Sequence, residues 1–214
     1  MALEVERKFL DVDLDDLRNR LREQGARCLG AHFEANTVFD TPEGDLFSSG
    51  RLLRLRSQEW PDKTCCVLTL KLPVAAPTGA EHCKVRDERE VGVADAAVMR
   101  HILEGLGYSP AARYEKVREP WRLNGVEVEL DILSFMQGAE LEGPAEAINA
   151  VQKSLGLDKV AISTKNYHQL HQDWLCRNNL PPRRSFVFDE TQRRAWRRQL
   201  GLPDEDSPLS PEQR

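Results

Sequence analysis

Residues 3–9 read LEVERKF, with a charged side chain at every second position. A β-strand turns alternate residues to opposite faces, so Glu4, Glu6 and Lys8 are expected to share one face, with apolar residues behind them. Two adjacent carboxylates repel one another unless a proton or a cation lies between them. The stretch therefore predicts a strand that carries a polar site, and oxygen ligands of this kind suit a divalent metal ion.

The same alternation recurs along the chain and predicts a set of amphipathic strands. The charged faces carry Lys84, Arg86, Glu88 and Glu90; Arg54 and Arg56; Lys116 and Arg118; Glu127, Glu129 and Asp131; and Glu140 and Glu142. Strands are expected near residues 3–9, 32–39, 51–57, 64–72, 81–91, 111–121, 125–133 and 138–142. Ordinary strands with one solvated face would explain any single run. Acids, however, gather in the first and last strands and cations in the middle ones, which favours a negative pole facing a positive pole.

Turn and helix signals organise these strands. Asn124 and Gly125 stand between two alternating runs and predict a tight hairpin. Apolar residues at helical spacing predict helices after Asp13, Asp95 and Pro144, each of which would pack on the apolar side of the strands. Such strands could close into a barrel with a polar lumen, or could form an open sheet with a solvated charged face.

Composition narrows the class of protein. The 214 residues are 40% hydrophobic and 30% charged, with a net charge of -5, which argues against nucleic-acid or membrane-surface partners. Neither a signal peptide nor a membrane span is expected. Five cysteines without metal-binding spacing favour a reducing, cytoplasmic location. We expect a main domain at 1–176, a basic and helical appendage at 177–202, and a disordered tail at 203–214.

The order of motifs resembles that of a known family. Glu4-x-Glu6-x-Lys8 resembles the ExExK signature of the CYTH superfamily, the triphosphate tunnel metalloenzymes. Further matches follow in order along residues 3–175. They are Phe39-Asp40-Thr41, Arg54-x-Arg56, Lys71, Lys84-x-Arg86-x-Glu88-x-Glu90, the Lys116 and Arg118 strand, Asp131, Glu140-x-Glu142, and Lys165 with Tyr167. The layout is most similar to the bacterial class IV adenylyl cyclase branch.

The resemblance implies an α+β fold built on an eight-stranded antiparallel β-barrel, a tunnel with a charged lumen and helices packed outside. It also implies an enzyme whose tunnel binds a triphosphate. It implies Mg²⁺ or Mn²⁺ as cofactor, held by Glu4, Glu6, Glu140 and Glu142, with Asp131 or Glu129 nearby. It implies that phosphate oxygens are bound by Lys8, Arg54, Arg56, Lys71, Lys84, Arg86, Lys116, Arg118 and Lys165. The catalytic set would be Glu4, Glu6, Lys8, Arg54, Arg56, Lys71 and Glu88. The partner would be a small molecule such as ATP, tripolyphosphate or thiamine triphosphate, and a homodimer is left open.

Two reactions fit such a site. Attack by water on the terminal phosphorus would make the protein a triphosphatase, and attack by the ribose 3′-hydroxyl on the α-phosphorus would make it an adenylyl cyclase. The triphosphatase is favoured because no residue set identifies a purine pocket, and Trp60, Trp121 and Trp174 are expected to serve packing or strand ends. A protein that binds polyphosphate or nucleotide without turnover is the alternative from another class.

Overall fold

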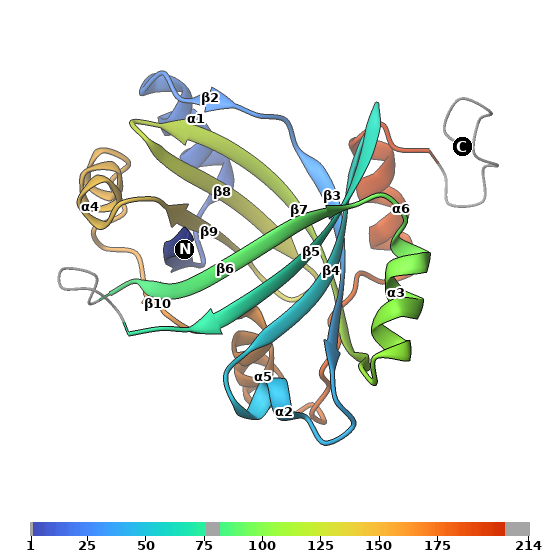
Figure 1. Ribbon diagram of the computed structural model, residues 1–214. Helices are drawn as coiled ribbons and strands as arrows, with labels where there is room; N and C mark the ends of the chain where they lie inside the picture. The colour runs from blue at the N-terminus through green and yellow to red at the C-terminus, as the bar shows by residue number, and fades with distance from the viewer. Residues whose placement is uncertain (1, 76–81, 204–214) are drawn as a thin grey trace.

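Eight long strands dominate the computed structural model, which describes residues 2–75 and 82–203 (Figure 1). They are β1 (Ala2–Leu10), β3 (His32–Asp40), β4 (Leu52–Trp60), β5 (Lys63–Pro73), β6 (Lys84–Val93), β7 (Ser109–Leu123), β8 (Val126–Leu133) and β9 (Gln137–Glu142). All eight expected strands are present. Two short strands that the sequence did not predict, β2 (Arg27–Cys28) and β10 (Ile162–Ser163), pair with β7 and β1.

The sheet closes on itself. Antiparallel pairing runs in the order β1, β6, β5, β4, β3, β7, β8, β9, and β9 pairs with β1 again. The two ladders of β1 share Glu6: residues 2–6 pair with β6, and residues 6–10 pair with β9. The expected α+β fold with a closed eight-stranded barrel is therefore confirmed, and the open sheet is excluded.

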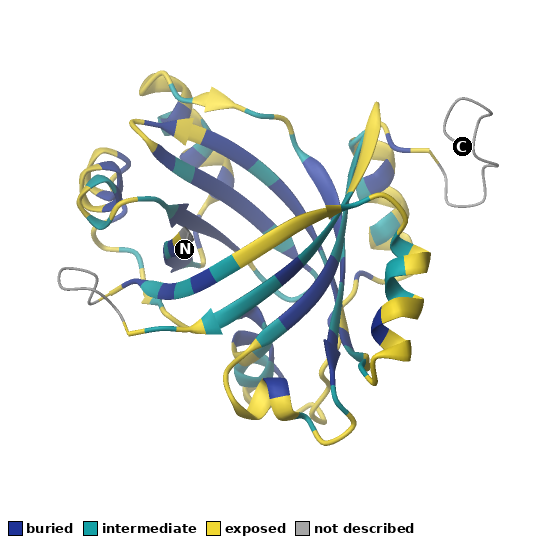
Figure 2. Ribbon diagram, in the orientation of Figure 1, coloured by how far each residue is buried: buried dark blue, intermediate teal, exposed yellow. Residues whose placement is uncertain are grey.

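Six helices occur in the part of the chain that the structure describes. They are α1 (Leu14–Glu23), α2 (Asp45–Ser48), α3 (Ala96–Gly105), α4 (Ala145–Ser154), α5 (Tyr167–Arg177) and α6 (Glu190–Gln199). Asp13 and Asp95 accept hydrogen bonds from the first turns of α1 and α3, as N-cap residues do. The main core lies outside the barrel wall, where α1 and α4 cover β8 and β9 with residues such as Leu17 and Ile148 (Figures 1 and 2).

The hairpin between β7 and β8 sets the register of two charged strands. Asn124 and Gly125 have φ values of 49° and 79°, the positive φ pair of a two-residue hairpin turn. The turn pairs Arg118 with Asp131 and Arg122 with Glu127, so cations of β7 lie beside acids of β8.

The C-terminal segment, which holds the basic residues of α6, packs on the barrel. Phe186 forms a parallel bridge with Tyr114 of β7, and Phe188 packs near Phe33. A capping box at Asp189 opens α6, where Arg197 donates to Glu59 across 2.9 Å. The predicted tail lies outside the described residues from 204 onward. No helix in the described ranges has the length and apolar character to cross a bilayer.

Barrel closure can be tested at Gly138 in β9. A Cβ atom there would lie 2.6 Å from the backbone oxygen of Phe9, across the β1–β9 ladder. We expect Gly138→Ala to destabilise the protein by about 1–3 kcal/mol, because one strand must shift. Thermal unfolding should show a melting temperature lower by several degrees. Gly92→Ala in β6, where a Cβ meets nothing within 4 Å, is the matched control; equal melting temperatures for the two variants would contradict the closure argument.

Candidate functional site

A charged cavity of about 420 Å³ lies inside the barrel. Its lining contains eight glutamates and seven lysines or arginines, so its charge is nearly balanced. The acids are Glu4, Glu6, Glu88, Glu90, Glu127, Glu129, Glu140 and Glu142, and the cations are Lys8, Arg54, Arg56, Lys71, Lys84, Lys116 and Arg118. Alternation along each strand brings these side chains into one chamber because the sheet is closed.

Three residues of the sequence-predicted set do not line this cavity. Arg86 is half-buried on β6, where it pairs with Glu4 in the ladder. Lys165 is exposed, and its ammonium lies 2.5 Å from Asp173 on α5. Asp131 is fully buried behind the lining, where it contacts Arg118 and Lys116.

Six of the eight lining glutamates occupy one contiguous wall of the barrel, formed by β8, β9 and β1. Glu127 and Glu6 both pair in register with Glu142, so three carboxylates stand in one row across the three strands. In the next row Glu140 stands between Glu129 and Lys8. Like charges directly opposite one another are destabilising, so such rows favour a bound cation.

The acidic wall is not an isolated pole of charge, because ion pairs join acids to cations of other strands. Lys71 lies 2.6 Å from Glu4 and 3.0 Å from Glu88, and Lys84 lies 2.7 Å from Glu6. The expected opposition of an acidic pole and a cationic pole is therefore found only in part. Two of these pairs, Lys84 with Glu6 and Lys71 with Glu88, are register partners on adjacent strands, and a list of strands does not contain their order in the barrel.

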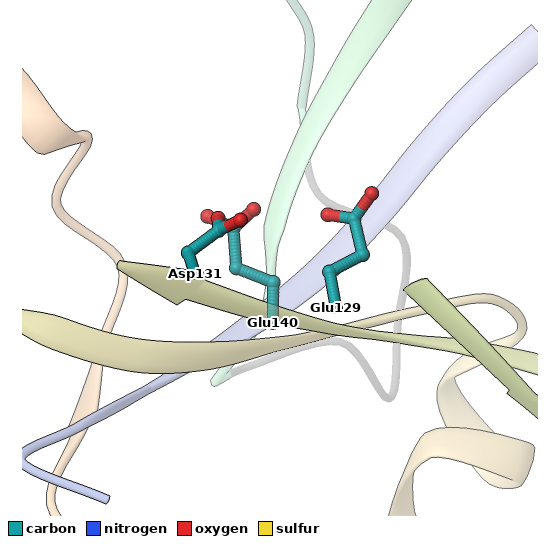
Figure 3. A group of neighbouring side chains, drawn as sticks. All are labelled: Glu129, Asp131 and Glu140. Atoms are coloured by element: carbon teal, nitrogen blue, oxygen red, sulfur yellow. The ribbon is translucent and has the colours of Figure 1, made fainter. Parts of the chain in front are cut away.

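Glu129, Asp131 and Glu140 form a cluster whose carboxylate oxygens could hold a metal ion (Figure 3). Arg118 already contacts all three: its guanidinium pairs with Glu129 and lies 2.6 Å from Asp131 and 2.7 Å from Glu140. The ammonium of Lys8 also pairs with Glu140. A metal ion bound here would have to displace part of this cationic shell.

Glu4 and Glu142 have unused carboxylate oxygens. Oε2 of Glu4 is buried and has no hydrogen-bond partner, and Glu142 has no ion pair within the described ranges. Burial raises the pKa of Glu4 to about 8 despite the attraction of Lys71, and burial also raises the pKa of Glu142. Together with Glu6, this pair fits a hard divalent cation, which would replace the proton.

The arginines of β4 are held by polar partners that leave the lumen within reach. Arg54 donates to the Tyr114 hydroxyl across 3.0 Å and to Thr69 across 3.3 Å. Arg56 lies 3.1 Å from Glu90 and 3.5 Å from Glu34. Guanidinium groups positioned in this way can offer paired N–H donors to phosphate oxygens.

Sequence reasoning missed Glu34, an acid of β3 that is buried behind the cavity lining and contacts several lining residues. It is fully buried and contacts His32 at 3.0 Å, Gln58 at 3.1 Å and Lys116 at 3.5 Å. Burial alone would raise the pKa of Glu34, but Lys116 and His32 hold it well below its usual range. The signal that could have revealed it is the alternation of polar residues at 32, 34 and 36.

Tyr167 of α5 was expected only as part of a late motif. Its hydroxyl donates to Asp131 across 2.7 Å, and the Lys8 ammonium lies 4.5 Å from its ring centroid. The first turn of α5 therefore contributes Asn166, Tyr167 and His168 to one end of the cavity.

Residues 2–169 match the CYTH domain family. The chain belongs to the CYTH family. This confirms the resemblance drawn from Glu4-x-Glu6-x-Lys8 and the later motifs, and family membership makes the protein a relative of metalloenzymes that bind triphosphates. The segment containing α6 lies beyond the matched CYTH residues.

Several relatives of this CYTH protein are named putative adenylate cyclases. A Methanocaldococcus jannaschii protein called "putative adenylate cyclase" is 24% identical, over 78% of this chain and 98% of its own length. The structure of a "putative adenylate cyclase" from Vibrio parahaemolyticus has a TM-score of 0.65 at 19% identity, covering 79% of this chain and 97% of its own. A "putative adenylyl cyclase" from Hippeastrum, whose title reports a dominant triphosphatase activity, has a TM-score of 0.58 at 20% identity, covering 85% and 97%.

The raised carboxyl pKa values predict a pH dependence for the metal-free protein. Glu4 and Glu142 have higher pKa values in the folded state than in the unfolded state, so the folded state binds their protons more tightly. This stabilises the protein at low pH, and the stabilisation by Glu4 is lost as pH rises through about 8. We expect the melting temperature in EDTA to fall between about pH 6.5 and 8.5. Burial lowers the pKa of His168 to about 4, so its contribution to the pH dependence of stability falls below this interval.

Two measurements complete this test. Mg²⁺ should raise the melting temperature more at the upper pH than at the lower one, because metal competes with the proton. Glu4→Gln should flatten the fall seen in EDTA. A melting temperature that rises over the interval in EDTA would contradict the assignment.

Proposed function

We propose that this CYTH protein is an Mg²⁺- or Mn²⁺-dependent triphosphatase that acts on an inorganic or organic triphosphate bound in the barrel. The observation that supports this most strongly is the nearly balanced charge of the lining beside a wall of carboxylates. A triphosphate brings about four negative charges, which the seven cations of the lining cannot offset while they neutralise glutamates. A divalent cation on the carboxylate wall removes that conflict, because it releases lysines and arginines to bind phosphate.

The carboxylates of the acidic wall are the proposed metal ligands. Glu4, Glu6 and Glu142 would hold the ion, with Glu129 and Glu140 able to contribute and Asp131 anchoring the cations behind them. When bound, the ion supplies positive charge to the phosphate and lowers the pKa of a coordinated water.

The cations of the lining would bind and orient the phosphate chain. Lys8, Arg54, Arg56, Lys71, Lys84, Lys116 and Arg118 face the same chamber from different strands, so they can surround a bound chain. Glu88 lies 3.0 Å from Lys71 and 3.8 Å from Arg54, and we assign it the role of positioning these two. Arg86 and Lys165 are left out of this proposed set because they do not line the cavity in the described part of the chain.

A class IV adenylyl cyclase is the second candidate, favoured by the names of the relatives. A cyclase must hold a ribose 3′-hydroxyl against the α-phosphorus, and the described residues show no group assigned to that task. Hydrolysis needs only the phosphate chain, the metal and a water molecule. The Hippeastrum relative also supports the hydrolase, since it is described as having a dominant triphosphatase activity.

Product analysis separates these functions. We expect incubation with Mg²⁺ and ATP, tripolyphosphate or thiamine triphosphate to release inorganic phosphate from at least one of them. Cyclic AMP and pyrophosphate from ATP would establish the cyclase in its place. Tight binding of all three compounds with no product over several hours would leave the protein a binding module.

The acidic wall is tested by charge removal that preserves shape. Glu4→Gln and Glu6→Gln should each lower kcat/KM by at least about 100-fold, a loss of about 2.7 kcal/mol in transition-state stabilisation. Circular dichroism should show an unchanged fold. Glu23→Gln, an exposed position on α1, is the matched control and should keep full activity. Full activity of Glu4→Gln and Glu6→Gln at saturating Mg²⁺ would refute the assignment.

A further inference from the structure

The barrel wall beside Tyr114 is completed by residues 185–188, here called the C-terminal strap. The ladder between β7 and β8 does not reach the first half of β7. Along that half the Phe186 N–H donates to the Arg113 oxygen across 3.0 Å, and the Glu115 N–H donates to the Phe186 oxygen across 3.2 Å. The C-terminal strap therefore takes the place of β8 next to Tyr114.

Two aromatic side chains hold the ring of Tyr114 from different sides. Phe186 stacks on it, with ring centroids 5.1 Å apart and an interplanar angle of 24°. His168 of α5 meets the same ring edge-on, at 5.3 Å between centroids. Tyr114 is itself buried, and close contacts of this kind restrict rotation of the ring. The direction of its hydroxyl group is thereby fixed.

The Tyr114 hydroxyl connects this aromatic group to the lumen. It accepts a hydrogen bond from Arg54 across 3.0 Å, and a second nitrogen of Arg54 donates to Thr69 across 3.3 Å. Arg54 and Tyr114 both line the cavity, whereas Phe186 lies behind the lining. A long cationic side chain that is already oriented loses less conformational entropy when it binds phosphate. The support from Tyr114 therefore favours phosphate binding by Arg54.

We propose that Phe186 is a positioning residue, which fixes Tyr114 and through it the Arg54 guanidinium that binds the triphosphate. This rests on the proposed function, in which Arg54 contacts phosphate oxygens. Phe186 touches neither substrate nor metal, and its whole influence on binding passes through the Tyr114 ring. The C-terminal strap lies beyond the residues that match the CYTH family, so the site of this chain has a support from outside the matched span.

Calorimetric titration with tripolyphosphate in the presence of Mg²⁺ tests the proposal on the full chain. Tyr114→Phe removes the hydroxyl and should weaken tripolyphosphate binding by about three- to tenfold, the range of one hydrogen bond. Phe186→Leu removes the stacked ring and should weaken binding by about threefold. Phe188→Leu makes the same change elsewhere in the C-terminal strap, in a ring that lies 6.0 Å from Phe33, and should bind tripolyphosphate like the wild type.

A double-mutant cycle distinguishes positioning from a general loss of stability. If Phe186 acts through the Tyr114 hydroxyl, Phe186→Leu should have little further effect on binding in the Tyr114→Phe protein. Fully additive effects, equal weakening by Phe188→Leu, or unchanged binding by Tyr114→Phe or by Phe186→Leu would each overturn the proposal. If Phe186→Leu does not fold, Phe186→Met, whose flexible side chain adapts to the buried space, takes its place in the cycle.

Phosphate release from tripolyphosphate by the same proteins separates this proposal from the triphosphatase. Binding that depends on Phe186, without hydrolysis, would refute the triphosphatase and keep the positioning role. Hydrolysis together with wild-type binding by Phe186→Leu would refute the positioning role alone.

Discussion

Closure of the sheet between β1 and β9 is the constraint on which the rest of the structure depends. In an open sheet the alternating charges would face water, where ion pairs between them would change the stability little. Once the sheet is closed, the same side chains face one another across a chamber where solvation is reduced. Each buried carboxylate must then find a cation or retain a proton, since an unpaired buried charge is costly. The pairing of Lys71 with Glu4 and the raised pKa of Glu4 are two outcomes of this one requirement.

Any ion that enters the lumen has to compete with ion pairs that are already in place. Arg118 contacts three carboxylates at once, and in doing so it occupies the position that a metal could take in that cluster. The row of Glu127, Glu142 and Glu6 makes fewer ion pairs than the cluster around Arg118. A bound cation would therefore stabilise this row more. Binding of metal and phosphate would therefore redistribute existing partners, with carboxylates turning to the metal and guanidinium groups turning to phosphate oxygens.

Much of the fold could be predicted because charged and apolar residues alternate along each strand of the sequence. The strand that carries Glu4, Glu6 and Lys8 and the turn at Asn124 and Gly125 are local signals, and both appear in the structure. The remainder depends on long-range geometry. Glu34 was missed because its neighbours in sequence carry no other charge, and its importance arises only when β4 and β7 flank it. Lys165 stands in an irregular stretch before α5, where spacing does not determine the direction of a side chain. The ion pairs between strands, such as Lys71 with Glu4, likewise depend on distances that sequence motifs do not contain.

The C-terminal segment lies at the periphery but is connected to the chamber through two side-chain contacts. Phe186 stacks on Tyr114 with ring centroids 5.1 Å apart, and the hydroxyl of Tyr114 accepts a hydrogen bond from Arg54. A residue outside the matched family span is thereby two contacts away from the centre of the chamber. Sequence drift in this peripheral strap can alter the stiffness of Arg54 without changing any inward-facing residue. Substitutions on the outer surface can therefore influence the chamber from a distance.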